Sequence, residues 1–338
     1  MRILLPHPPL KWVGLLVVFT IFIGSFSLSI ALGQNSIPLR TTWEAFIHYD
    51  ATVTEHVIVT TSRLTRAVIA TIIGANMAIA GALMQALTRN PLAAPDILGI
   101  NAGALFFIVF SMTFFSVDSL RSYMWIAFLG AAVAAVLVYF LGSLGKDGLS
   151  PIKIVLAGAA MSALFISFTQ GLLVIDEQKI QSILFWLAGS VAGRSMDMII
   201  PVLPYMFGAS LLALLLGRHI NILLIGEEVA KSLGQQIVFI KVMMGLVIVI
   251  LAGGSVAVAG SVGFIGLIVP HMARGLVGPD YRWVIPYSAL LGASLLLLAD
   301  VAARFVIMPQ EMPISVMTAF LGAPFFIYIA RRGLAKHG

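Results

Sequence analysis

The sequence contains no cysteine and little charge. Without cysteine, the chain has no disulfide framework and no metal site that depends on thiolate ligands. Only 10% of the 338 residues are charged and 60% are hydrophobic, whereas a soluble domain carries about 25% charged residues. These figures exclude an ordinary soluble chain and indicate a protein that lies mostly within a membrane.

Recognised catalytic patterns are also absent. There is no HExxH zinc signature, and the stretch GSLGKDG (142–148) lacks the GxxxxGK[ST] spacing and the hydroxyl that hold a nucleotide phosphate and magnesium. We therefore predict no catalytic residue, no metal site and no cofactor held by this chain. The apolar runs have almost no ionisable group at their centres. This argues against a self-sufficient ion-coupled transporter, the main alternative, and a membrane-embedded enzyme is weaker still.

Apolar runs of the length that a membrane-spanning helix needs recur from end to end. Breaks at glycine, proline and charged residues divide them into about ten spans. The predicted fold is an all-α polytopic membrane protein, with a single domain over residues 1–338. The eighth span is short, and 176–196 is left open as a loop or an interfacial helix. The spans are 12–33, 64–87, 97–115, 122–143, 152–175, 197–216, 236–257, 261–276, 283–303 and 314–330.

The distribution of Lys and Arg predicts that both termini are cytoplasmic. On that assignment seven of the 20 Lys and Arg residues are external and the other 13 are cytoplasmic, as the positive-inside rule requires. The external set is Arg40, Arg63, Arg66, Arg121, Lys179, Arg194 and Arg304. Arg63 and Arg66 therefore stand at the outer mouth of the second span, against the rule. They either reach to lipid headgroups or pair with Glu55 or Asp300.

Small residues predict close contacts between helices in two spans, either within one bundle or along a pore. They are Gly74, Ala78, Gly81 and Ala82 in the second span and Gly260, Gly263 and Gly266 in the eighth.

A polar interruption at 217–241, GRHINILLIGEEVAKSLGQQIVFIK, separates two later spans. Within it, Glu227 and Lys231 have the i,i+4 spacing of a helix, and Gly226 and Gly234 bracket them. A short helix bounded by glycines can project a rigid surface from the membrane. A solvated connector remains the alternative.

Seven ordered blocks, from residue 63 to 332, resemble the iron-siderophore and vitamin B12 type of ABC-transporter permease, the ten-helix type II importers. The blocks are RLTRAVIATIIGANMAIAGALMQALTRNPLAAPDILGINAGA (63–104), LSPIKIVLAG (149–158), FWLAGS (185–190), LLIGEEVAKSLG (223–234), GSVGFIGLIVPHMAR (260–274), LLLLADVAAR (295–304) and EMPISVMTAFLGAPFFIYIARR (311–332). The resemblance implies a second permease subunit, as homodimer or heterodimer, two ATPase subunits that bind ATP and magnesium, and an extracytoplasmic substrate-binding protein. It also implies a location in the bacterial cytoplasmic membrane.

The resemblance implies roles for three groups of residues. The binding protein would dock on Arg63, Arg66 and Arg304; the ATPase would couple through Gly226, Glu227, Ala230 and Gly234; and the cytoplasmic gate would include Asn90, Leu92 and Ser150. Two positions depart from the family pattern. Thr65 stands where proline is usual, and Met196 where tryptophan is frequent.

The function implied is that of a permease subunit that carries a ferric siderophore inward, driven by ATP hydrolysis on partner subunits. Cobalamin, haem and ferric citrate are the alternative cargoes within the same family.

Overall fold

The computed structural model describes residues 4–115, 117, 119–144, 150–175 and 188–334, and their regular structure is entirely helical. The α-helices are α1 (Pro8–Ala31), α2 (Leu39–Ile47), α3 (Thr54–Val57), α4 (Leu64–Thr88), α5 (Ile100–Phe115), α6 (Leu120–Ser143), α7 (Pro151–Ile175), α9 (Met196–Ile199), α10 (Leu203–Ile225), α11 (Glu227–Ser232), α12 (Ile237–Ile248), α13 (Gly254–Ala259), α14 (Ile265–Val277), α15 (Tyr281–Phe305) and α16 (Ile314–Leu334). The π-helical turns η1 (Ile58–Arg63) and η4 (Val249–Gly253) make α3–α4 and α12–α13 continuous, and the 3-10 turn η2 (Pro95–Leu98) precedes α5.

The predicted all-α membrane fold is confirmed. Among the described residues, seven helical segments are long and apolar enough to cross a membrane, and three shorter apolar helices accompany them. Every predicted span overlaps one of these ten segments. The eighth span is the short α14, and most of the open region at 176–196 lies outside the described residues.

The sixth span lies further along the chain than predicted. It was expected at 197–216, but α10 runs from Leu203 to Ile225, so the first part of the predicted polar segment 217–241 is helical. Leu216, Ile220 and Leu223 are buried on one face, and this inward face outweighs the charge of the single Arg218. The helix ends only at Gly226.

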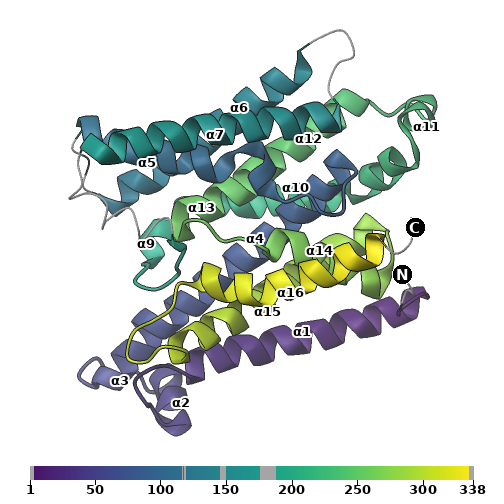
Figure 1. Ribbon diagram of the computed structural model, residues 1–338. Helices are drawn as coiled ribbons and strands as arrows, with labels where there is room; N and C mark the ends of the chain where they lie inside the picture. The colour runs from purple at the N-terminus through teal and green to yellow at the C-terminus, as the bar shows by residue number, and fades with distance from the viewer. Residues whose placement is uncertain (1–3, 116, 118, 145–149, 176–187, 335–338) are drawn as a thin grey trace.

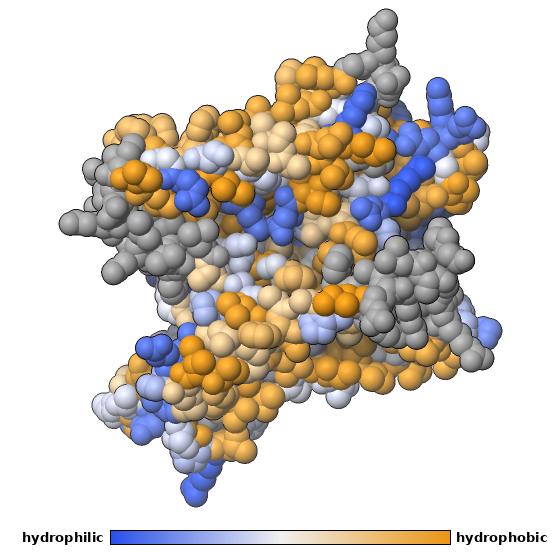
Figure 2. All heavy atoms as spheres, in the orientation of Figure 1, coloured by the Kyte–Doolittle hydropathy of each residue, from blue (hydrophilic) through white to orange (hydrophobic). Residues whose placement is uncertain are grey.

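The bundle has two distinct ends, at the right and left of Figure 1. α11 lies at one end, where α1 begins and α16 finishes; we call this the α11 end. α2, α3 and α9 lie at the opposite end, the α2 end. Figure 2 shows hydrophobic residues over most of the visible face and hydrophilic residues over α11 and over α2, with smaller hydrophilic groups between these ends. This is the distribution expected of a bundle whose middle lies in hydrocarbon and whose ends meet water.

α4 is buried along most of its length and forms the centre of the bundle. A Cβ added to Gly74 would lie 2.4 Å from the carbonyl oxygen of Gly292 in α15, and one added to Gly81 would lie 1.9 Å from that of Gly266 in α14. Both approaches require glycine, so the close packing predicted for these positions is confirmed. Gly260 and Gly263 instead belong to the turn before α14.

Candidate functional site

Arg63 lies at the α2 end, where η1 passes into α4. Its guanidinium donates to the carbonyl oxygens of Ile30 (3.1 Å) and Ala31 (2.8 Å), in the last turn of α1, and to that of Asn35. The residue is only 4% exposed. The last four carbonyl groups of a helix have no partner within it, so Arg63 supplies donors that α1 cannot supply itself.

Arg304, in the last turn of α15, performs the same task from the other side. It donates to the carbonyl oxygens of Ser29 (2.8 Å) and Leu32 (2.6 Å) and to the Ser29 hydroxyl (2.9 Å), and it is 2% exposed. Positive charge at this end of α1 is also favoured by the helix dipole. Arg63 and Arg304 thus complete the C-terminus of the first helix.

Asp300 is the centre of the charge network at this end. Its carboxylate is fully buried and accepts from the Nε of Arg66 at 2.8 and 3.0 Å and from Arg304. Arg66 also pairs with Glu311, at 2.7 Å. The network therefore joins α4 and α15 to the segment that precedes α16.

The predicted pairing with Asp300 is confirmed for Arg66. Docking of a partner protein on all three arginines stays a prediction. In the isolated chain only Arg66 retains appreciable exposure, 14% of its side chain, because Arg63 and Arg304 are directed toward α1. Thr65 lies inside the continuous η1–α4 helix, so the missing proline leaves Arg63 and Arg66 on one rigid element.

α11 is a short helix bounded by two glycines, as predicted. Gly234 has φ of 77°, which favours glycine. Its N–H donates to the carbonyl of Lys231 (3.0 Å), while Gln235 donates to Ala230 (3.0 Å). This pair of bonds is the Schellman motif, which ends a helix and turns the chain sharply. Ala230, in the second turn of α11, is fully buried.

Glu227, the first residue of α11, connects three parts of the α11 end. Its carboxylate lies 2.9 Å from the Nζ of Lys241 in α12 and 3.7 Å from a guanidinium nitrogen of Arg89. Arg89 also donates to the carbonyl of Leu223 at the end of α10 (3.2 Å). α11 is therefore in contact with Arg89, the residue that follows α4.

The turn after α4 contains two of the predicted gate residues. Arg89 has φ of 51°, and Asn90 then accepts from the N–H of Leu92 through its side chain (2.9 Å). Leu92 is exposed. Ser150 lies at the start of α7, where its hydroxyl accepts from the N–H of Lys153 (3.3 Å). Among the described residues no hydrogen bond joins Ser150 to the Asn90 turn.

Arg89 is the residue that the sequence analysis missed. It was counted only as one cytoplasmic cation, although it stands directly before the predicted gate residue Asn90. Its contacts place the residue beside Asn90 within 3.7 Å of Glu227 in α11 and within hydrogen-bond distance of the end of α10. The only sequence indication was its place in the block TRNPLAAPD.

The start of α15 holds the same end of α10 in place. Asp280 caps α15 by accepting from the N–H of Arg282 (3.0 Å), and it also accepts from the side chain of Asn221 in α10 (2.5 Å). Burial alone would raise the pKa of Asp280, but hydrogen bonds from Arg282 and Asn221 lower the pKa to about 2. Asp280 is therefore ionised near neutral pH, and α10 gives α11 a fixed base.

A cavity of about 360 Å³ lies between α5, α7 and the turn after α13, and four polar residues line it: Asp96, Asn101, Ser162 and Ser261. Asn101 donates to the carboxylate of Asp96 and to the hydroxyl of Ser261 (3.1 Å), and Ser162 completes the polar lining. The sequence analysis did not identify this group, because its members come from distant segments. Within the described residues, no three His, Cys, Asp or Glu side chains gather as a metal site would require.

Comparison with known proteins agrees with this architecture. The model of the FecCD transport family matches residues 19–332. A Bacillus subtilis protein named "Probable siderophore transport system permease protein YfiZ" is 52% identical over 96% of this chain and 97% of its own. The Fe(3+)-citrate import permease YfmD of the same organism is 40% identical over 94% of each chain. A solved structure of a metal-chelate type ABC transporter, in an inward-facing conformation, superposes with a TM-score of 0.81 at 28% identity, covering 94% of this chain and 98% of the other.

Proposed function

Because the chain belongs to the FecCD transport family, we propose that it is the permease subunit of a bacterial ABC importer whose cargo is a ferric siderophore. It is a multi-pass protein of the bacterial inner membrane. The observation that supports this cargo most strongly is the 52% identity to a siderophore transport permease over nearly the full length of both chains. Ferric citrate is the second candidate, because a ferric citrate permease is 40% identical.

The proposed complex contains a second permease subunit, identical or related, two ATPase subunits and an extracytoplasmic binding protein. ATP and magnesium belong to the ATPases, and this chain holds no cofactor of its own. α11, with Gly226, Glu227, Ala230 and Gly234, is the proposed contact with the ATPase. Its rigidity supports this role, because a short helix fixed by a Schellman turn can transmit a displacement.

The proposed transmission runs from α11 through Glu227 and Arg89 to the gate turn that contains Asn90 and Leu92. ATP binding would move α11 relative to the bundle and change the population of two gate conformations. Ser150 would take part from the start of α7. Glu227 and Arg89 form a long ion pair, with 3.7 Å between the nearest nitrogen and oxygen atoms. Such a weak contact can form and break during the transport cycle.

Deletion of the gene tests the cargo. We expect the deletion strain to lose growth when a ferric siderophore is its single iron source and to grow normally on inorganic iron supplied in excess. Plasmid-borne wild-type gene restores growth. A deletion strain that fails only on ferric citrate would replace the siderophore with citrate as cargo.

Cysteine labelling tests the orientation, for which both termini and α11 are proposed to be cytoplasmic. The chain has no cysteine, so Ser232→Cys, at the exposed end of α11, introduces a single reactive group. We expect a membrane-impermeant maleimide to label this cysteine in inside-out vesicles. We expect no labelling in cells whose cytoplasmic membrane is intact and whose wall or outer membrane has been made permeable to the reagent. Labelling from the outside would reverse the proposed orientation.

Docking of the binding protein tests the role of the arginine group at the α2 end. Arg66 is the most exposed of the three arginines, and Glu311 pairs with it in the isolated chain. We expect Arg66→Gln to weaken docking, because it removes the positive charge. We expect Glu311→Gln to strengthen docking, because it frees Arg66 for the binding protein. Each change should amount to about 0–1 kcal/mol, and added salt should reduce the wild-type affinity. The measurement is the affinity of purified binding protein for the reconstituted importer. If the affinity is unchanged by both substitutions and by added salt, the three arginines have a structural role only.

A further inference from the structure

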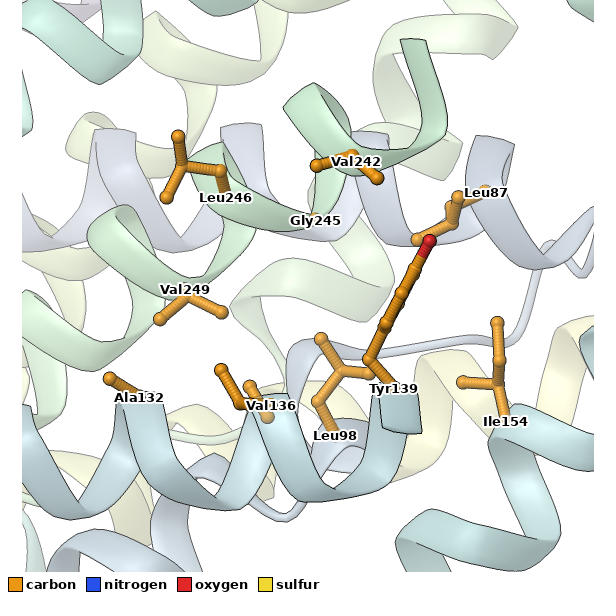
Figure 3. Close-up of a pocket in the computed structure, with 11 residues that line it drawn as sticks. Leu87, Leu98, Ala132, Val136, Tyr139, Ile154, Val242, Gly245, Leu246 and Val249 are labelled. Carbon is orange, nitrogen blue, oxygen red and sulfur yellow. The ribbon is translucent and has the colours of Figure 1, made fainter. Parts of the chain in front are cut away.

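An apolar groove opens between α6 and α12 near the α11 end (Figure 3). Its volume is about 270 Å³. The side chains of Leu87, Val136, Ile154, Val242 and Leu246 line it. Among the lining side chains that the structure describes, the only polar group is the hydroxyl of Tyr139. The groove therefore offers hydrocarbon contacts and almost no hydrogen bonds, which suits an apolar chain rather than a soluble molecule.

The groove faces the part of the surface that is suited to lipid. Among its lining residues, Val136 and Tyr139 on α6 and Val242 and Leu246 on α12 are exposed at the surface. Large apolar side chains exposed on membrane-spanning helices meet acyl chains or another helix. The groove is thus accessible from the hydrocarbon layer.

Gly245 keeps the groove open. It lies inside α12, has no positive φ, and an added Cβ would find no atom within 4 Å. Neither close packing nor backbone conformation requires glycine there, although glycine weakens a helix relative to alanine. The absent side chain leaves room in the groove for an occupant.

A polar cavity continues from the groove toward the α11 end. The two share Tyr139 and Val242, and the polar cavity is lined by Glu227, Glu228, Lys231 and Lys241, among others. Among the described lining residues, these four charges sum to zero. An apolar slot that leads into a cavity with both signs of charge has the two-part chemistry of a zwitterionic phospholipid, and tyrosine is typical of the boundary between the two parts.

We propose that the groove binds one acyl chain of a zwitterionic phospholipid, whose headgroup lies in the adjoining cavity. Its phosphate meets Lys231 and Lys241, and its ammonium group meets Glu228. The lipid thereby stands beside Glu227 and α11, so that membrane composition acts on the same segment that is proposed to contact the ATPase. The site itself does not depend on the proposed cargo.

Native mass spectrometry of the purified importer tests this site. The protein is reconstituted in vesicles of phosphatidylethanolamine and phosphatidylglycerol in equal amounts, extracted in detergent, and the retained phospholipids per permease are counted. Gly245→Leu fills the groove from inside. Gly208→Leu is the matched control, since Gly208 is also a helical glycine with no atom within 4 Å of an added Cβ, but it lies in α10 away from the groove.

We expect wild type and Gly208→Leu to retain one phosphatidylethanolamine per permease that Gly245→Leu loses, and Lys231→Gln with Lys241→Gln to reduce that retention at least threefold. Equal retention in Gly245→Leu and wild type would overturn the site. Retention of phosphatidylglycerol in preference would overturn the headgroup assignment. Loss of permease pairing in Gly245→Leu, with lipid counts unchanged, would assign the groove to a second protein chain instead.

Discussion

We expect Asp300→Asn to lower the free energy of unfolding by about 3–5 kcal/mol, because it leaves buried arginine charge without its counter-charge. Asp300 is fully buried between Arg66 and Arg304, and Arg304 is 2% exposed. An asparagine side chain can still accept a hydrogen bond, but it carries no charge to offset two guanidinium groups. The measurement is chemical unfolding of the purified permease in detergent.

Glu311→Gln is the matched control for this network. Glu311 pairs with the same Arg66 but is 29% exposed, so its removal should cost about 0–1 kcal/mol. If Asp300→Asn does not yield folded protein, the double substitution Asp300→Asn with Arg304→Gln should recover part of the yield. It removes the charge of Arg304, keeps an amide donor near the end of α1 and leaves Arg66 paired with Glu311. Equal stability of Asp300→Asn and Glu311→Gln would contradict the assigned roles.

Gly234→Pro should abolish ATP-driven uptake while the permease remains inserted in the membrane. Gly234 has φ of 77° and donates its N–H to Lys231, whereas proline fixes φ near −65° and has no N–H. The Schellman turn that sets the direction of α11 is then lost. Uptake into vesicles and the amount of permease in the membrane fraction are measured together.

Two further variants separate coupling from general damage. Gly234→Asn should retain most of the uptake, because asparagine tolerates the left-handed conformation. Glu227→Ala should reduce uptake without abolishing it, since a charge-assisted contact contributes about 1.5–3 kcal/mol and Glu227 is nearly half exposed. Unchanged uptake in Gly234→Pro would remove α11 from the coupling mechanism.

The membrane-spanning helices could be predicted because hydrophobic length is a local property of the sequence. The same holds for α11, whose glycines and charge spacing lie within ten residues. The end of α10 could not be read in this way, because residues 217–225 remain helical through burial of Ile220 and Leu223 against other helices. Local polarity alone favoured an earlier end.

The arginines at the α2 end show a second limit of sequence reasoning. Arg63 and Arg304 donate to the end of α1, to carbonyl groups that are 32–33 and 272–275 residues away along the chain. Any residue at a span end can reach lipid, water or protein, and only the folded arrangement shows which carbonyl groups need a donor. Arg89 was missed for the same reason, because its partners Leu223 and Glu227 lie in another segment.

ATP-dependent uptake in proteoliposomes tests the central claim most directly. The permease is reconstituted with its partner permease and the ATPase subunits. ATP is placed in the compartment that the ATPase subunits face. A radiolabelled ferric siderophore and the binding protein are added to the opposite compartment. The account predicts accumulation only when ATP, magnesium and the binding protein are all present, and no accumulation with Gly234→Pro. Accumulation driven by an ion gradient without ATP would contradict it and identify a self-sufficient transporter.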